Sequence, residues 1–172
     1  IVPNTLKYEK ALVLISGGSN GGSPPSSVDD EIVSLALMSN SVVIEVKMIP
    51  NEPVVFSDET FKRSEDAIIA YTWDKYLRTG DADWPLQLPM VKGVVKSMDA
   101  VQDFFRSVLN DGNAVNEFVL LGASKRGWTT WLTGATDDRV VAIIPVVFDA
   151  LNLVDSFNHH YGAYGFWSPA VS

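Results

Sequence analysis

Short, continuously apolar runs alternate along the chain with longer segments in which apolar side chains recur every three or four residues. The short runs are rich in β-branched residues, which is typical of strands buried on both faces of a parallel sheet. They lie at 11–15, 42–49, 118–121 and 140–148. The longer segments have the periodicity of amphipathic helices. They lie at 29–38, 64–79, 90–109 and 124–133.

The order of these segments, β-α-β-α-α-β-α-β, predicts an α/β fold. We expect a mostly parallel sheet of four strands with helices on both faces, joined by right-handed crossovers. Ser64 is expected to cap the second helix, and Gly80 follows the end of that helix. Pro145 lies inside the last apolar run, so a bulge or the end of the strand is expected near it.

Composition excludes several classes of protein. The chain has 172 residues, enough for one domain with a sizeable core, and its hydrophobic share of 47% is that of a globular protein. A formal net charge of −8 disfavours nucleic acid and anionic membranes as partners. No apolar run approaches the roughly 20 residues of a membrane-spanning helix. The absence of cysteine excludes disulfides, thiolate catalysis and cysteine-based zinc sites.

No motif for a cofactor or a metal is found. The Gly-rich stretch at 17–22 matches neither a dinucleotide fingerprint nor a phosphate-binding loop. The acidic clusters lack the spacing of a calcium loop. We interpret them as solvated loops and helix caps; they comprise Asp58, Glu59, Glu65, Asp66, Asp81 and Asp83.

Ser124 lies between the third apolar run and the last predicted helix, in the sequence GASKRG at 122–127. A strand, a tight Gly-x-Ser turn and a helix form the context of a nucleophile elbow. Small residues at Gly122 and Gly127 would let backbone segments approach closely, and the start of the helix would favour a developing oxyanion. Arg126 stands where the usual signature has glycine. The alternative is that Ser124 only caps the helix.

Gly17 and Gly18 directly follow the first predicted strand. In a hydrolase of this type one oxyanion-hole N–H follows the nucleophile, and the other comes from a loop after an earlier strand. The backbone N–H of Lys125 and those of Gly17 and Gly18 are therefore the predicted oxyanion-hole donors. A simple flexible turn is the alternative for the glycine pair.

The side chains of Lys125 and Arg126 leave several possibilities open. Either one could place a cation beside the oxyanion or bind an acidic group of a substrate. Arg126 could equally form a structural ion pair with one of the many carboxylates.

A serine nucleophile needs a base, usually histidine, oriented by a carboxylate. His159 and His160 are the two histidines, and Asp149 precedes them, so the chain order of a triad is formally present. The spacing is short, however, because no later strand intervenes. The histidines could instead belong to an aromatic packing segment. Since neither end of the chain closes an element, we expect residues 1–172 to be a partial domain, whose sheet is completed by further polypeptide or a second chain.

Five stretches of the chain resemble the PhoPQ-activated pathogenicity-related protein family, which includes the autocrine proliferation repressor group. They are GGSNGG at 17–22, IPNEPVVF at 49–56, SEDAIIAYTWDKYL at 64–77, WPLQLPMVKGVVKSMDAVQ at 84–102 and GASKRGWTTWLTGATDDRVVAIIPVVFDALN at 122–152. The resemblance implies an α/β-hydrolase fold with Ser124 at the elbow and a secreted or periplasmic location. It also implies that the triad acid and histidine lie beyond residue 172.

Two functions therefore compete. The first is a serine hydrolase, an esterase or peptidase acting on a small molecule or peptide, with Ser124 as the nucleophile. The second is a secreted signalling or virulence-associated binding protein that uses a hydrolase scaffold without turnover, because fold does not dictate function. A purely structural role in completing the sheet is a third possibility.

Overall fold

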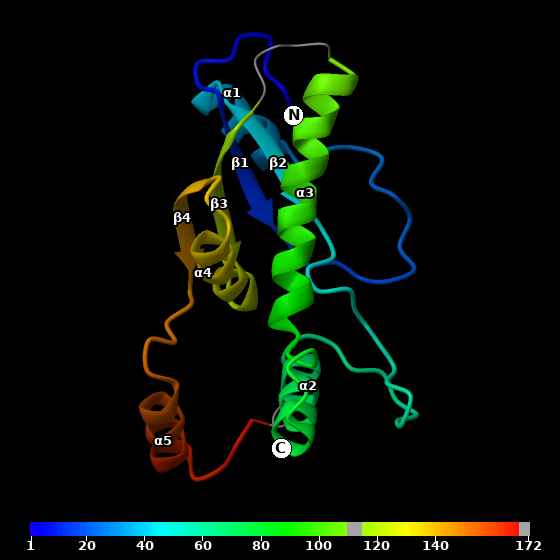
Figure 1. The fold of residues 1–172 in the computed structure, drawn as a ribbon, viewed down its shortest axis with the longest axis vertical. Helices are drawn as coiled ribbons and strands as arrows, with labels where there is room; N and C mark the ends of the chain where they lie inside the picture. Colours follow the sequence, from blue (N-terminus) through cyan, green and yellow to red (C-terminus); the bar gives the residue numbers. More distant parts are fainter. Residues whose placement is uncertain (110–114, 169–172) are drawn as a thin grey trace.

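The computed structural model describes residues 1–109 and 115–168, and these form one parallel sheet with helices around it (Figure 1). The strands are β1 (Lys10–Ile15), β2 (Val42–Val46), β3 (Glu117–Ala123) and β4 (Val140–Val146). The helices are α1 (Asp30–Ser39), α2 (Asp66–Thr79), α3 (Gln87–Ser107), α4 (Lys125–Thr136) and α5 (Leu153–Tyr164). The strand order is β2-β1-β3-β4, with every neighbouring pair parallel. The predicted α/β class and the four-stranded parallel sheet are confirmed.

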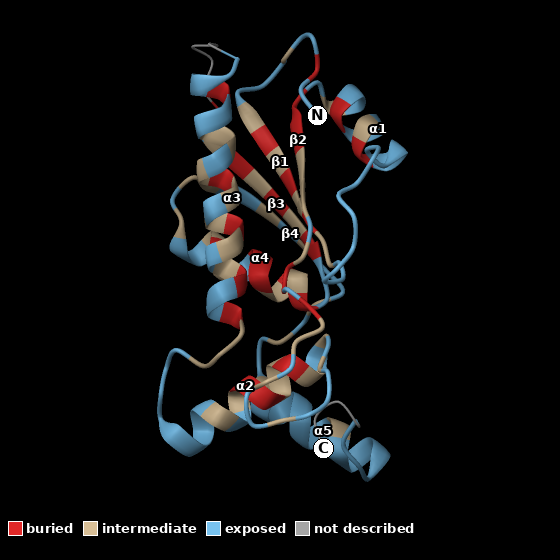
Figure 2. Cartoon of the chain, turned by 90° about the vertical axis from the view of Figure 1, so that its right-hand side faces the viewer, coloured by how far each residue is buried: buried red, intermediate tan, exposed pale blue. Residues whose placement is uncertain are grey.

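The main core lies between one face of the sheet and the helices α3 and α4. Alternate residues of β1 and β3 are buried on this face because side chains alternate across a strand. They meet the apolar stripe of α3, whose buried members recur at four-residue steps: Met90, Val94 and Met98. Figure 2 shows these helices on one side of the sheet and α1 on the other.

The second face of the sheet is covered over β2 and β1 only. Ile32 and Ala36 of α1 pack on Val43, with Leu12 and Leu14 beside them. Across β4 the same face lies open, since Ile144 and Val146 are exposed. β4 is also a terminal strand of the sheet, so one row of its backbone N–H and C=O groups has no neighbouring strand among the described residues.

Several boundaries differ from those expected from sequence. β2 ends at Val46, not at residue 49, because Met48 adopts a φ of 65° and turns the chain out of the sheet. The longest helix begins at Gln87, three residues earlier than expected, and accommodates Pro89 in its first turn, where a missing N–H costs no hydrogen bond. Glu65, not Ser64, occupies the cap position of α2. β4 ends at Val146, one residue after Pro145, as expected.

α5 was not predicted from the sequence. The sequence suggests an aromatic-rich surface or packing segment around His159 and His160, but residues Leu153–Tyr164 form a helix of 12 residues, none of them buried. Figures 1 and 2 both place α2 and α5 beyond the carboxyl ends of the strands. In α/β sheets this edge is where ligands bind. Within the described residues, no helix has the length and apolar character needed to cross a bilayer.

Candidate functional site

Ser124 lies at the sharp turn between β3 and α4. Its backbone adopts φ 55° and ψ −124°, a combination that costs energy for a residue with a Cβ. Two hydrogen bonds hold it there: Ser124 N donates to the Val146 carbonyl at 2.9 Å, and Trp128 N donates to the Ser124 carbonyl at 3.1 Å. The residue is exposed, and its hydroxyl makes no capping hydrogen bond to the helix. Side-chain capping therefore does not account for serine at this position.

Two glycines make the turn possible. A Cβ at Gly122 would lie 2.5 Å from the backbone oxygen of Arg126, and a Cβ at Gly127 would lie 2.9 Å from Cβ of Phe148. Both distances are shorter than side-chain carbons tolerate. The strand before Ser124 and the helix after it can therefore pass this closely only because both positions lack a side chain.

The Gly17–Gly18 segment lies beside the elbow. β1 and β3 are neighbours, with Ile15 opposite Gly122, so the residues that follow these two strands meet at one edge of the sheet. A Cβ at Gly17 would lie 2.6 Å from Nη2 of Arg126. In the described part of the chain, the backbone N–H groups of Gly17, Gly18 and Lys125 have no hydrogen-bond partner. The three predicted oxyanion donors are thus brought to the same edge as Ser124.

The Arg126 side chain is nearly buried and lies against a group of carboxylates. Its Nε donates to the Ile49 carbonyl at 2.6 Å, and its Nη1 and Nη2 each donate to Glu65 at 3.0 Å. Nη2 also lies 3.4 Å from Glu52 Oε1. This planar, forked geometry is one that arginine alone supplies. Of the roles left open by the sequence, the geometry matches the structural ion pair.

The side chain of Lys125 is also paired with carboxylates. Its ammonium group pairs with Glu65 and, at 3.1 Å, with Asp66 at the start of α2, and its side chain is only 7% exposed. Lys125 and Arg126 therefore anchor the elbow helix to α2 through carboxylates. Both cations are thus paired with carboxylates.

The two glutamates of this cluster have pKa values shifted in opposite directions. Burial, and then the neighbouring Glu65, raises the pKa of the Glu52 carboxyl above its ordinary value. Burial also acts to raise the pKa of Glu65, but hydrogen bonds from Arg126, Glu52 and Lys125 outweigh it and lower that pKa to about 2. Glu65 is thus the firmly ionised partner of the two cations.

Sequence reasoning missed Glu52 and interpreted Glu65 as one of the solvated loop and helix-cap residues. Glu65 does occupy the cap position of α2. Its side chain also joins the elbow helix to α2, and its backbone N–H donates to Glu52 at 2.6 Å. Its φ of 55° and ψ of −130° nearly repeat those of Ser124. The unusual Lys-Arg pair after Ser124 was the available signal, since two cations at a buried turn require carboxylate partners.

A pocket of about 390 Å³ opens beside Ser124, between α2, α4 and α5. Aromatic and aliphatic side chains form most of its wall. They are Ile69, Ala70, Trp73, Leu77, Trp128, Phe148, Leu153 and Phe157. Asp66, Asp74 and Lys125 complete the lining. An exposed serine next to an apolar, concave surface is an arrangement that suits binding of an organic ligand.

The candidate triad partners lie outside this pocket. His160 lies against Trp167, with the rings parallel and their centroids 5.9 Å apart, and also contacts Tyr164. His159 is exposed on α5, and neither histidine lines the Ser124 pocket. Asp149 is exposed and accepts a hydrogen bond from Leu151 N at 3.5 Å. The described structure therefore does not join these three residues to Ser124.

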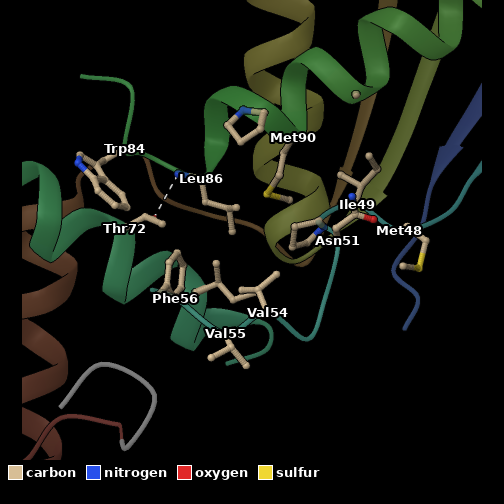
Figure 3. Close-up of a pocket in the computed structure, with 14 residues that line it drawn as sticks. Met48, Ile49, Asn51, Val54, Val55, Phe56, Thr72, Trp84, Leu86 and Met90 are labelled. Carbon is tan, nitrogen blue, oxygen red and sulfur yellow. Dashed lines mark hydrogen bonds between the residues drawn. The ribbon is translucent and has the colours of Figure 1, made fainter. Parts of the chain in front are cut away.

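A second, larger pocket of about 490 Å³ lies between the 48–56 segment, α2 and the start of α3. Figure 3 shows Phe56, Trp84, Leu86 and Met90 around it. Thr72 Oγ1 accepts a hydrogen bond from Leu86 N at 3.3 Å at its edge. Among the described residues, none of the elbow lines this pocket, and its one lining hydroxyl, that of Thr72, is hydrogen bonded to the backbone. Nor do the described residues gather three or more histidine or carboxylate side chains that could hold a metal ion.

Comparison of the sequence with known proteins identifies a relative and a family. Autocrine proliferation repressor protein A of Dictyostelium discoideum is 42% identical over 173 residues, covering 99% of this chain and 34% of the relative. The chain thus spans about a third of that curated relative's length. No solved structure matches. The model of the PhoPQ-activated pathogenicity-related protein family matches residues 1–172, and the chain belongs to that family.

Proposed function

We propose that this chain carries the nucleophile and the oxyanion hole of a serine hydrolase of the α/β-hydrolase superfamily, an esterase or a peptidase. The observation that carries the proposal is the conformation of Ser124, which is strained and exposed between a parallel strand and a helix. Strain of this kind persists where the surrounding structure imposes it, and it clusters at functional sites. In the part of the chain that the structure describes, the Ser124 hydroxyl makes no capping hydrogen bond that would explain the strain.

In this proposal Ser124 Oγ attacks the carbonyl carbon of an ester or amide. The negative charge that develops on the carbonyl oxygen is stabilised by the backbone N–H of Lys125 and by those of the Gly17–Gly18 segment. These N–H groups have no partner among the described residues, so they are available to a ligand. Preorganised donors of this type are usually the largest contribution to acyl-transfer catalysis.

The base and the acid of the triad come, in this proposal, from outside residues 1–172. His159, His160 and Asp149 do not line the pocket of Ser124. The four strands would then be the central part of a larger sheet, which continues from the open edge of β4. The relative's greater length is consistent with this, since the matched region makes up 34% of it. Family membership also leads us to propose a secreted or periplasmic location.

A second candidate function is a secreted signalling or binding protein without turnover. It is favoured by the printed name of the Dictyostelium relative, a proliferation repressor, and by the absence of a histidine from the Ser124 pocket in the described residues. In this case the same pocket would bind a ligand or partner, and Ser124 would be dispensable.

The test is labelling of the whole protein with a fluorophosphonate probe, which reacts with activated serines. We expect labelling of wild-type protein and none in Ser124→Ala. Ser34→Ala removes an exposed serine of α1 and serves as the matched control that keeps its label. If the wild-type protein is not labelled at Ser124 and a biological activity survives Ser124→Ala, the hydrolase proposal is wrong and the binding function is favoured.

A further inference from the structure

The wall of the Ser124 pocket is built from aromatic side chains that hold one another in place. Trp73 and Trp128 meet edge to face with ring centroids 5.4 Å apart, and Trp128 stacks on Phe148, also at 5.4 Å. Trp73 Nε1 donates at 2.9 Å to Oε1 of Gln87, which is only 6% exposed. Because the rings are fixed before a ligand arrives, an apolar group can bind there with little loss of side-chain entropy.

The charges around the pocket select against an anion. Asp66 and Asp74 both lie in its lining, and Lys125 is the single cationic side chain there among the described residues. The Lys125 ammonium group is already shared between Glu65 and Asp66. A carboxylate that entered the pocket would lose its hydration and find no free cation to compensate it, because Lys125 pairs with Glu65 and Asp66 and Arg78 pairs with Asp74.

The position of the pocket relative to Ser124 indicates which part of a substrate it holds. Ser124 and Lys125 form part of the lining, and Trp128 lies one helical turn further along α4. In the acyl-enzyme, Ser124 Oγ is bonded to the carbonyl carbon of the acyl group, so the acyl group stays beside Ser124 after the alcohol has left. That group is therefore the one that lies nearest to the apolar wall.

We propose, on the basis of the hydrolase function above, that the substrate is an ester with an uncharged, apolar acyl group of medium chain length or arylalkyl type. In the first step the Oγ–acyl bond forms and the ester C–O bond breaks, while the serine proton passes through the histidine base to the departing alcohol. Water then cleaves the acyl-serine, which yields the carboxylic acid and restores Ser124. The acyl chain remains against Trp73, Trp128 and Phe148 during both steps.

The experiment measures hydrolysis by the whole protein of p-nitrophenyl esters from acetate to octanoate, together with the anionic hemisuccinate. The leaving group is constant, so differences report the acyl group. We expect kcat/KM to rise about fourfold per added methylene up to hexanoate, from the usual gain on burying a CH₂. The hemisuccinate should react at least tenfold more slowly than the neutral butyrate.

A variant that fills the pocket tests the assignment directly. Ala70→Phe should lower kcat/KM for hexanoate at least tenfold more than for acetate. Leu77→Trp, at an exposed position of the same lining, repeats the test if Ala70→Phe does not fold. Val55→Phe places the same added ring in the 490 Å³ pocket and is the matched control, with both esters unchanged.

Binding to Ser124→Ala separates this inference from the hydrolase proposal. Hexanamide, which resists hydrolysis, should quench tryptophan fluorescence of that variant, and Ala70→Phe should abolish the quenching. Binding without turnover of any ester would overturn the hydrolase function and support the ligand class. Turnover without a chain-length preference, or with the hemisuccinate preferred, would overturn the ligand class alone. Neither binding nor turnover would overturn both.

Discussion

The guanidinium of Arg126 donates two hydrogen bonds to the carboxylate of Glu65, both at 3.0 Å, although the two residues are 61 positions apart in the chain. This pair joins the residue two positions after Ser124 to the residue that opens α2. Since α4 forms one wall of the Ser124 pocket and α2 another, the pair sets the distance between the two walls.

Arg126→Met should destabilise the fold, because it removes the guanidinium group that donates hydrogen bonds to Glu52 and Glu65. Breaking a buried pair costs roughly 3 kcal/mol or more, and the partial exposure of Glu65 reduces this to about 2 kcal/mol. Arg126→Lys should fall between Met and wild type, since it restores the charge without the bidentate geometry. The measurement is the urea unfolding midpoint.

The control for that series is Arg78→Met. Arg78 pairs with Asp74 four residues earlier on the same exposed helix face. A pair of this kind is worth about 0.5 kcal/mol. Equal losses in Arg126→Met and Arg78→Met would contradict the assigned role of Arg126.

Stability at acid pH should depend on Glu65. Hydrogen bonds from Arg126, Glu52 and Lys125 overcome the opposing effect of burial and hold the pKa of Glu65 at about 2, below its ordinary value of 4.5. A carboxyl with a lowered pKa in the folded state binds fewer protons there than in the unfolded chain. Its contribution to stability is therefore complete above pH 4.5 and is lost as the pH falls from 4.5 towards 2.

Urea unfolding of wild type and Glu65→Gln at several pH values checks this. Wild type should be the more stable at pH 7, and the two midpoints should converge as the pH approaches 2. A difference that stays constant over this range would show that the carboxylate charge of Glu65 is not what stabilises the fold.

Gly122→Ala should disrupt the elbow. The new Cβ would lie 2.5 Å from the Arg126 backbone oxygen and 2.7 Å from Thr130 Oγ1, so the start of α4 has to shift. Overpacking of this kind costs about 1–3 kcal/mol. Gly162→Ala on α5, where a Cβ meets nothing within 4 Å, is the matched control and should be neutral or slightly stabilising in thermal unfolding. Equal effects at both positions would argue against close packing at the elbow.

Ser124→Gly should stabilise the protein, although it removes the nucleophile. Glycine adopts a φ of 55° without steric cost, which relieves strain of roughly 1–3 kcal/mol. After the entropy cost of glycine in the unfolded chain, a net gain of about 1 kcal/mol remains. Ser124→Ala keeps the Cβ and therefore the strain, so its midpoint should stay close to wild type. A glycine variant no more stable than the alanine variant would mean that the turn stores no strain.

The sequence was sufficient to predict the fold class and the sharp turn from strand to helix at Ser124, because both depend on local patterns. Apolar runs fix the strands, and Gly122 and Gly127 mark the close approach around Ser124. The partners of Lys125 and Arg126 could not be predicted, because Glu52 and Glu65 are brought to them only by tertiary packing. α5 was not predicted, although its apolar residues recur at three- and four-residue steps, at Leu153, Phe157, Tyr161 and Tyr164.

The exposure of α5 also bears on how relatives can diverge. Two contacts join the pocket walls of α2 and α4 to the folded core: the Arg126–Glu65 pair and the Trp73–Gln87 hydrogen bond. Leu153 and Phe157, in contrast, reach the pocket from a helix that contributes no buried side chain. Substitutions in α5 can therefore accumulate without loss of stability. Selection for a new ligand would act first on these 12 residues, while the elbow and its carboxylate anchors stay constrained.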